Sequence, residues 1–188
     1  MLPIARITVA GLITGAMFAS GTAALGGHRF VVVNDNIMGG RSTSQVESVG
    51  NSLRFTGLIN TNGGGFASCR TEAKVPPGSK HVKLRVRGDG KLYKFTLRDG
   101  LGGPTFQHDF LTSPSAANGE SEEHVLPLSE FLPSYMGRMP AQPVPLDLSQ
   151  MAQAGFMLSL KTSRGEPNPA FGEGEFPFSL VVEDMEFS

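Results

Sequence analysis

Alternation of apolar and polar side chains is the feature that most restricts the fold of this chain. In residues 81–87, Val82, Leu84 and Val86 alternate with basic side chains. Because successive side chains of a β-strand point to opposite faces, this pattern predicts a strand with one buried and one solvated face. Similar short runs predict further strands at residues 30–33, 53–55, 66–71, 93–98, 105–110, 156–160 and 176–182.

Turn-forming residues separate these runs, as in Gly88-Asp89-Gly90, and helical patterning is confined to residues 147–154. Many short strands that do not alternate with helices predict an all-β fold, an antiparallel β-sandwich of the jelly-roll type with one short helix. Residues 81–87 and 93–98 flank the Gly-Asp-Gly turn, and we expect them to form a hairpin with one wet, basic face. We expect residues 28–188 to form a single domain.

Charge and cysteine content exclude several classes of protein. The 16 Lys and Arg residues nearly balance the 17 Asp and Glu residues, and the net charge is -1. No bulk basic field is therefore present to hold nucleic acid or an anionic membrane. The single cysteine, Cys69, excludes an intramolecular disulfide and a structural zinc cluster. Its place on the expected strand at residues 66–71 favours a buried small side chain over a reactive nucleophile.

Catalytic and cofactor motifs are not recognisable in the sequence. Four histidines are scattered along the chain, and His108 and Asp109 would point to opposite faces of one strand. Lys91 lacks the glycine spacing of a phosphate-binding loop, and no dinucleotide fingerprint occurs. We therefore expect no enzyme activity, no metal and no cofactor.

Residues 1–27 have the layout of a secretory signal peptide. They contain no acidic residue and one basic residue, Arg6, followed by an apolar run and a stretch of small residues. Export is the first prediction for localisation. A mitochondrial or plastid targeting segment is the alternative. Contact with a membrane is expected only peripherally or through an uncleaved amino terminus.

Two glycine-rich segments, residues 34–42 and 60–70, are the most specific features of the chain. Asp35 can accept backbone amides within a turn, and Met38 can fill an irregular apolar gap. Gly39 and Gly40 allow positive φ angles or a close approach of two backbones. The first segment is therefore interpreted as a structural corner, and a partner-binding loop remains the alternative.

The order of the motifs resembles the complex I intermediate-associated protein 30 family. The segment at residues 34–42 is followed by Phe55-Thr56-Gly57 and then by the Gly-Gly-Phe-Ala-Ser sequence at residues 64–68. The resemblance covers residues 31–182. It implies a jelly roll similar to galactose-binding domains, no enzyme activity, and a role as an assembly factor or chaperone for respiratory complex I.

Two functions follow as expectations. The first is a non-catalytic module that binds a protein partner, such as the subunits of a respiratory or other membrane complex. The second is an exported carbohydrate-binding module, although a chain with no Trp and two Tyr offers few stacking platforms. The expected binding residues are Asp35, Met38, Gly39, Gly40, Arg41, Asn62, Gly64, Phe66, Arg70, Arg85, Lys94 and Arg98.

Overall fold

Two antiparallel sheets form the protein. The computed structural model describes residues 22–100, 102–114 and 119–188. Sheet A has the strand order β1 (Thr22–Leu25), β2 (His28–Asn34), β5 (Phe66–Glu72), β11 (Gln153–Ser159), β7 (Leu92–Arg98), β8 (Thr105–Leu111) and β10 (Leu132–Ser134). Sheet B has the order β3 (Thr43–Val49), β4 (Ser52–Asn60), β12 (Glu175–Phe187), β6 (His81–Arg87) and β9 (Glu122–Pro127).

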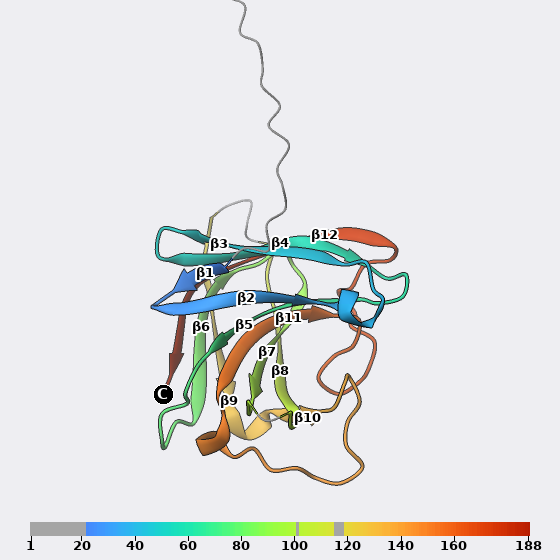
Figure 1. Ribbon diagram of the computed structural model, residues 1–188. Coiled ribbons are helices and arrows are strands. Elements are labelled where there is room, and N and C mark those ends of the chain that lie inside the picture. Colours follow the sequence, from blue (N-terminus) through green and yellow to red (C-terminus); the bar gives the residue numbers. More distant parts are fainter. Residues whose placement is uncertain (1–21, 101, 115–118) are drawn as a thin grey trace, which may run out of the picture.

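The hydrophobic core lies between the two sheets. The apolar faces of their strands meet there, and the largest side chains, among them Phe30, Phe55, Tyr93 and Phe95, are fully buried. Aromatic rings contact each other across the interface, as where Tyr93 of sheet A and Phe178 of sheet B lie 6.5 Å apart between ring centroids. In Figure 1, β3, β4 and β12 run across the top, and β10 with the loop that follows it lies at the bottom. The predicted antiparallel β-sandwich is confirmed.

The predicted hairpin of residues 81–87 and 93–98 is wrong, although both strands form. β6 belongs to sheet B, between β12 and β9, whereas β7 belongs to sheet A, between β11 and β8. The Gly88-Asp89-Gly90 segment is therefore a crossover between the sheets. Asp89 ties the crossover to both layers, because its carboxylate accepts bonds from the Tyr93 hydroxyl of β7 (2.9 Å) and from the Ser179 amide of β12 (2.9 Å).

The hairpin prediction failed because alternation identifies the apolar face of a strand but not its neighbours. Alternation correctly placed Val82, Leu84 and Val86 on one face of β6, and Tyr93, Phe95 and Leu97 on one face of β7; all are buried. Two strands with strong apolar faces can lie side by side in one sheet or face each other across a sandwich. Alternation is the same in both cases, so it does not choose between them.

Helical structure is limited to short 3-10 turns in the described residues: η1 (Asp35–Met38), η3 (Leu128–Glu130) and η4 (Leu148–Gln150). The helix expected at residues 147–154 is one such turn. Asp147 does cap it, since its carboxylate accepts from the Ser149 amide at 3.0 Å. Met151 then takes an extended conformation and enters the core, which ends the turn.

The first described strand overlaps the predicted targeting segment. β1 pairs with β2 from Thr22 to Leu25, and Ala23 and Leu25 are buried in the core. Most of the predicted segment, residues 1–21, lies outside the described residues. In the part of the chain that the structure describes, no helix is long and apolar enough to span a bilayer.

Candidate functional site

The two glycine-rich segments meet at the carboxylate of Asp35, which is buried. Its Oδ1 accepts from the Ser42 amide (3.0 Å), and its Oδ2 accepts from the Ser42 hydroxyl (2.7 Å). Oδ2 also accepts from the amides of Gly65 (2.7 Å) and Phe66 (3.2 Å), which belong to the second segment. Asp35 therefore joins the end of β2 to the start of β5.

Glycines make room for this carboxylate. A Cβ atom at Gly40 or at Gly64 would lie 2.2 Å from an atom of the Asp35 carboxylate, closer than any real contact. Gly39 meets the other requirement, because its φ of 85° lies in the left-handed region that favours glycine. The geometry of these residues is that of a structural corner, as the sequence suggested.

The corner lies at one end of a groove on the outer face of sheet A. The groove has a volume of about 510 Å³ and crosses β5, β11, β7, β8 and β10. Gly64 and Asp35 line its end, and the loops at residues 136–138 and 160–161 line its edge. A groove of this size that crosses the centre of a sheet is suited to binding part of a ligand.

Lys94 lies on the floor of the groove and is 5% exposed. Its Nζ donates to the side-chain oxygen of Gln107 on β8 at 3.2 Å. Burial lowers the pKa of Lys94 to about 8, and the negative charge of Asp109 opposes this shift. Asp109 is itself bound to Ser163, whose amide and hydroxyl both donate to it. Lys94 is thus a nearly buried cation whose nearest acid has other hydrogen bonds.

Two arginines share the floor with Lys94. Burial, together with repulsion from Arg98, lowers the pKa of Arg70 to about 10. Gly155 of β11 pairs with Arg70 of β5 and leaves space for it, because a Cβ there would lie 3.1 Å from the Arg70 Cγ. Among the described residues, no salt bridge joins Arg70, Lys94 or Arg98 to a carboxylate.

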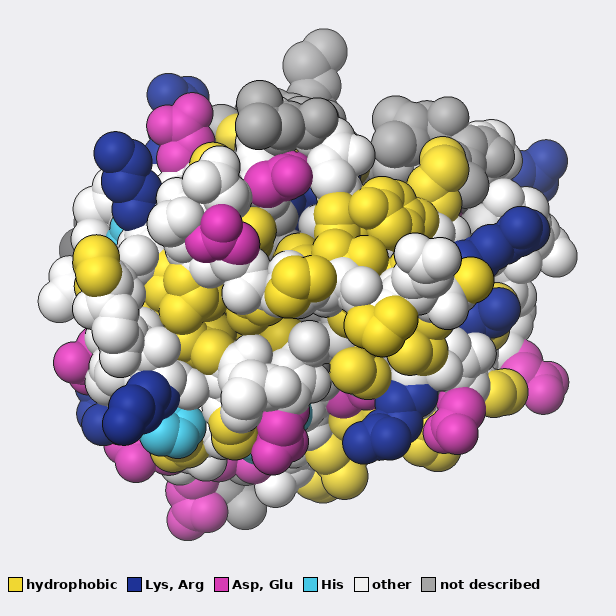
Figure 2. All heavy atoms as spheres, turned by 90° about the horizontal axis from the view of Figure 1, so that it is seen from below, with side chains coloured by type: hydrophobic (Ala, Val, Ile, Leu, Met, Phe, Trp, Pro, Cys, Tyr) yellow, Lys and Arg dark blue, Asp and Glu magenta, His cyan; other side chains and the backbone are white. Residues whose placement is uncertain are grey.

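Exposed apolar side chains border the same groove. Met136 is 86% exposed, and Leu160 is 45% exposed. Met136 has a φ of 49° at the tip of a tight turn closed by two hydrogen bonds between Tyr135 and Arg138. A non-glycine residue with positive φ is strained, and such residues gather at functional sites. Figure 2 views the side where β10 and the following loop lie, and hydrophobic side chains gather over its middle.

Half of the expected binding residues line this groove. They are Asp35, Gly64, Phe66, Arg70, Lys94 and Arg98. Gly39 and Gly40 stand behind Asp35 in the corner, and Arg41 and Asn62 are exposed outside the groove lining. The side chain of Met38 lies outside the described part of the chain, so its predicted gap-filling role stays a prediction.

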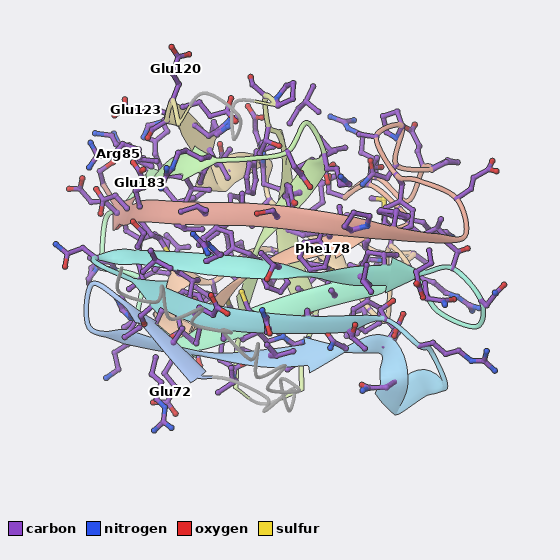
Figure 3. The ribbon with its side chains drawn as sticks, turned by 90° about the horizontal axis from the view of Figure 1, so that it is seen from above. Glu72, Arg85, Glu120, Glu123, Phe178 and Glu183 are labelled. Carbon is purple, nitrogen blue, oxygen red and sulfur yellow. The ribbon has the colours of Figure 1, made fainter. Side chains whose placement is uncertain are left out.

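The expected basic face of Lys83, Arg85, Lys94 and Arg98 does not exist as one surface. Arg85 is on β6 of sheet B, and the lysine and arginine of β7 are on sheet A. Arg85 lies 3.7 Å from Glu183 of β12, and Glu123 of β9 is its register partner. Figure 3 shows these three side chains together at one end of sheet B. Lys94 is also not on a wet face, since it is almost fully buried.

Sequence reasoning missed the far side of the groove. The missed lining residues are polar or apolar side chains of β8, β10, β11 and their loops: Thr105, Gln107, Ser134, Met136, Arg138, Met157, Ser159, Leu160 and Lys161. Alternation within β8 and β11 places these side chains on the face opposite the core. Only the strand order, with β11 between β5 and β7, brings them beside the basic residues.

Cys69 and the metal-ligating residue types are the other places to look for chemistry in the described residues. Cys69 is fully buried, which raises the pKa of its thiol and confirms the expectation of a buried small side chain. No group of three or more His, Cys, Asp or Glu residues in the described ranges is placed to hold a metal ion.

Solved structures with a similar fold include carbohydrate-binding modules and part of an agarase. The family 11 carbohydrate-binding module of the cellulosomal cellulase Lic26A-Cel5E of Clostridium thermocellum superposes with a TM-score of 0.56 and 12% identity, covering 84% of this chain and 85% of the module. The agarase AgWH50C superposes with a TM-score of 0.52 and 11% identity, covering 85% of this chain and 24% of the agarase. At these identities the likeness concerns the fold alone.

Sequence comparison places the chain more specifically. No curated protein sequence matches it significantly. The model of the family described as Complex I intermediate-associated protein 30 matches residues 21–182, and the chain therefore belongs to that family.

Proposed function

We propose that this protein is a non-catalytic binding module that holds a segment of a protein partner in its groove during assembly of a membrane complex. The observation that carries the proposal is the groove on sheet A, whose floor is basic and whose border exposes Met136 and Leu160. Methionine and other flexible apolar side chains at an exposed border are typical of surfaces that bind polypeptide. Membership of the family supports the assembly role.

Site-specific crosslinking tests the proposal. A photoreactive amino acid at position 136 would lie at the groove border, and one at position 49 would lie on sheet B, where Val49 is 41% exposed. Irradiation in native membranes should give a discrete adduct at position 136 only, identified by mass spectrometry as a subunit of a membrane complex. Adducts with only ribosomal or chaperone background, or equal adducts at both positions, would refute the assembly function.

A carbohydrate-binding function is the second candidate. It is favoured by the fold, which is shared with the family 11 module, and by side-chain hydroxyl groups of Thr105, Ser134 and Ser159 along the groove. Against it, Phe66 is the one aromatic side chain in the described groove lining, and sugar binding relies on aromatic platforms. A glycan array with no hits on the purified domain would remove this candidate.

We propose that the protein reaches its site of action through a cleaved export signal, with a mitochondrial or plastid route as the alternative. Cleavage before Thr22 would keep β1, whereas cleavage after Gly27 would remove Ala23 and Leu25 from the core. We therefore expect a mature amino terminus at or before Thr22. Sequencing the amino terminus of the native protein tests this, and an intact Met1 in the membrane fraction would instead identify an anchor.

A further inference from the structure

We infer that the groove on sheet A selects an acidic peptide segment, with a carboxylate held among Arg70, Lys94 and Arg98 and a neighbouring apolar side chain held against Met136 and Leu160. This inference rests on the proposed function for the peptide nature of the ligand. The preference for an anion rests on the groove itself.

The first support is the charge of the groove. Among the described residues that line it, five are basic, namely Arg70, Lys94, Arg98, Arg138 and Lys161, and one is acidic, Asp35. The Asp35 carboxylate already accepts bonds from two groups of Ser42 and from the amides of Gly65 and Phe66. The whole chain is nearly neutral, with a net charge of -1, so this concentration of positive charge is local.

The second support is the environment of the cations. Removing a charged group from water is unfavourable unless an opposite charge or hydrogen bonds replace the water. Lys94 is 5% exposed and Arg70 is partly buried, and neither forms a salt bridge within the described residues. Lys94 donates to Gln107 and is attracted by Asp109, but this attraction offsets only part of the effect of burial. Arg70 is also repelled by Arg98. A bound carboxylate would supply the missing negative charge, and arginine binds carboxylates with two parallel hydrogen bonds.

The third support is the border of the groove, which distinguishes a peptide from a simple anion or an acidic sugar. Met136 is 86% exposed, and its strained turn holds it away from the core. Leu160 is 45% exposed on the loop after β11. A ligand that combines negative charge with apolar side chains would cover both features, and a segment with Asp or Glu beside Leu, Ile or Met has that composition.

Known segments of this chain do not fit as the occupant. Residues 1–27 contain no acidic residue. The last residue, Ser188, is held at sheet B, where its carbonyl oxygen accepts from the amides of Lys80 (2.7 Å) and His81 (2.9 Å). In keeping with the proposed function, the acidic segment is expected to belong to a partner protein.

Two matched pools of short synthetic peptides test the inference. Each position of the first pool is drawn from Asp, Glu, Leu, Ile, Met and Ser, and the second pool replaces the acids by Asn and Gln. Peptides captured by the immobilised full domain are quantified by mass spectrometry. We expect the acidic pool to be captured at least about tenfold more strongly, which corresponds to about 1.4 kcal/mol.

Variants locate the effect. Arg70→Gln together with Arg98→Gln should abolish the preference for the acidic pool, whereas Arg85→Gln on sheet B should leave it unchanged. Met136→Ser should weaken capture of the acidic pool, and Val125→Ser, at a position 55% exposed on β9, is its matched control. Thermal melts of every variant establish that the domain is folded.

The outcomes separate the two proposals. Equal capture of both pools would overturn the preference for acid and leave the peptide-binding function standing. Binding of oligogalacturonate with the same dependence on Arg70 and Arg98, without binding of acidic peptides, would overturn the peptide ligand and favour the carbohydrate function. Capture of neither pool, with no binding of oligogalacturonate, would overturn the inference. Loss of preference in Arg85→Gln would show a nonspecific charge effect and would also overturn it.

Discussion

The two outer faces of the sandwich both carry basic residues, but only one of them places carboxylates beside these residues. On sheet B the arginines lie beside carboxylates: Arg54 beside Glu47 (3.9 Å), and Arg85 (3.7 Å) and Arg87 (3.0 Å) beside Glu183. On sheet A, Arg70, Lys94 and Arg98 line a groove without a carboxylate bridge in the described residues. Sheet B thus pairs its arginines with carboxylates of the chain, whereas the three cations of the groove on sheet A have no such pair among the described residues.

This difference shows why a count of basic residues says little about function. Exposed ion pairs typically contribute about 0–1 kcal/mol and need no other explanation. Cations that are partly desolvated and unpaired work against folding, and departures of this kind are expected at functional sites. We therefore expect removal of a basic charge from the groove on sheet A to raise stability, and removal of a charge from an ion pair on sheet B to lower it slightly.

The largest expected effect comes from Asp35, the one acid in the described groove lining. Asp35→Ala would remove the acceptor for four donors and leave the buried amide of Gly65 and the partly buried amide of Phe66 unpaired. We expect the free energy of unfolding to fall by about 3 kcal/mol, with a loss of roughly 6–12 °C in Tm. Asn62→Ala, at an exposed position of the same region, is the control. A shift below about 1 °C would show that Asp35 serves a ligand and not the fold.

The next largest expected change in stability concerns Lys94, whose replacement should raise Tm. Lys94→Met keeps the length of the side chain and removes a charge that is 5% exposed. Burying a charge is unfavourable when hydrogen bonds and opposite charges replace only part of its water, so removing this ammonium should stabilise the fold by about 1 kcal/mol or more and raise Tm by at least about 2 °C. Thermal melts at neutral pH measure it. A fall in Tm would mean that Gln107 and Asp109 already stabilise the ammonium, and sheet A would then resemble sheet B.

A third prediction uses pH to isolate the same charge. The pKa of Lys94 is about 8 in the folded protein and 10.5 in an unfolded chain, so between these values the unfolded chain binds more protons. The destabilisation by Lys94 is therefore complete below pH 8 and is relieved as pH rises. The charged groups around it are Asp35, Arg70, Arg98, Arg138 and Lys161 of the groove lining, and Asp109, which lies outside the lining and attracts the ammonium.

The measurement compares wild type with Lys94→Met by urea denaturation from about pH 7 to about pH 10. Burial raises the pKa of Cys69 and Tyr93, which lowers stability at high pH, but this contribution is common to both proteins. The stability gap between the two proteins should close as pH rises. A constant gap would show that Lys94→Met acts through packing alone.

The sequence predicted the faces of the strands better than their neighbours. Val82, Leu84 and Val86 were placed correctly because alternation is a local property of one strand. The hairpin of β6 and β7 was wrong because pairing depends on which apolar faces meet across the core, and Asp89 fixes that choice through Tyr93 and Ser179. β1 and β10 were missed because they are short, and β3 and β9 because each buries only one side chain.

The candidate site was predictable only in part for the same reason. Asp35 and Gly64 stand in glycine-rich segments whose chemistry is local, and the sequence identified both. Arg70 and Lys94 were noticed as basic residues, but they lie together on the floor of the groove only because β11 lies between β5 and β7. Met136 gave no signal, since a positive φ at a methionine follows from the turn closed by Tyr135 and Arg138.

The smallest expected change in stability is that of replacing Glu183 on sheet B. Glu183 accepts from the Ser121 hydroxyl (2.7 Å) and lies beside Arg85 and Arg87, and its side chain is 24% exposed. Glu183→Gln keeps the size and the hydrogen-bonding oxygen while removing the charge. Because water and salt screen exposed pairs, we expect a loss of at most about 1 kcal/mol that shrinks as salt is added.

Glu123→Gln, beside Arg85 but outside the described ion pairs, is the matched control. A loss of about 3 kcal/mol or more, independent of salt, would identify a buried network whose arginines depend on Glu183. The ion pairs of sheet B would then contribute strongly to stability, and the proposed contrast with the groove on sheet A would be wrong.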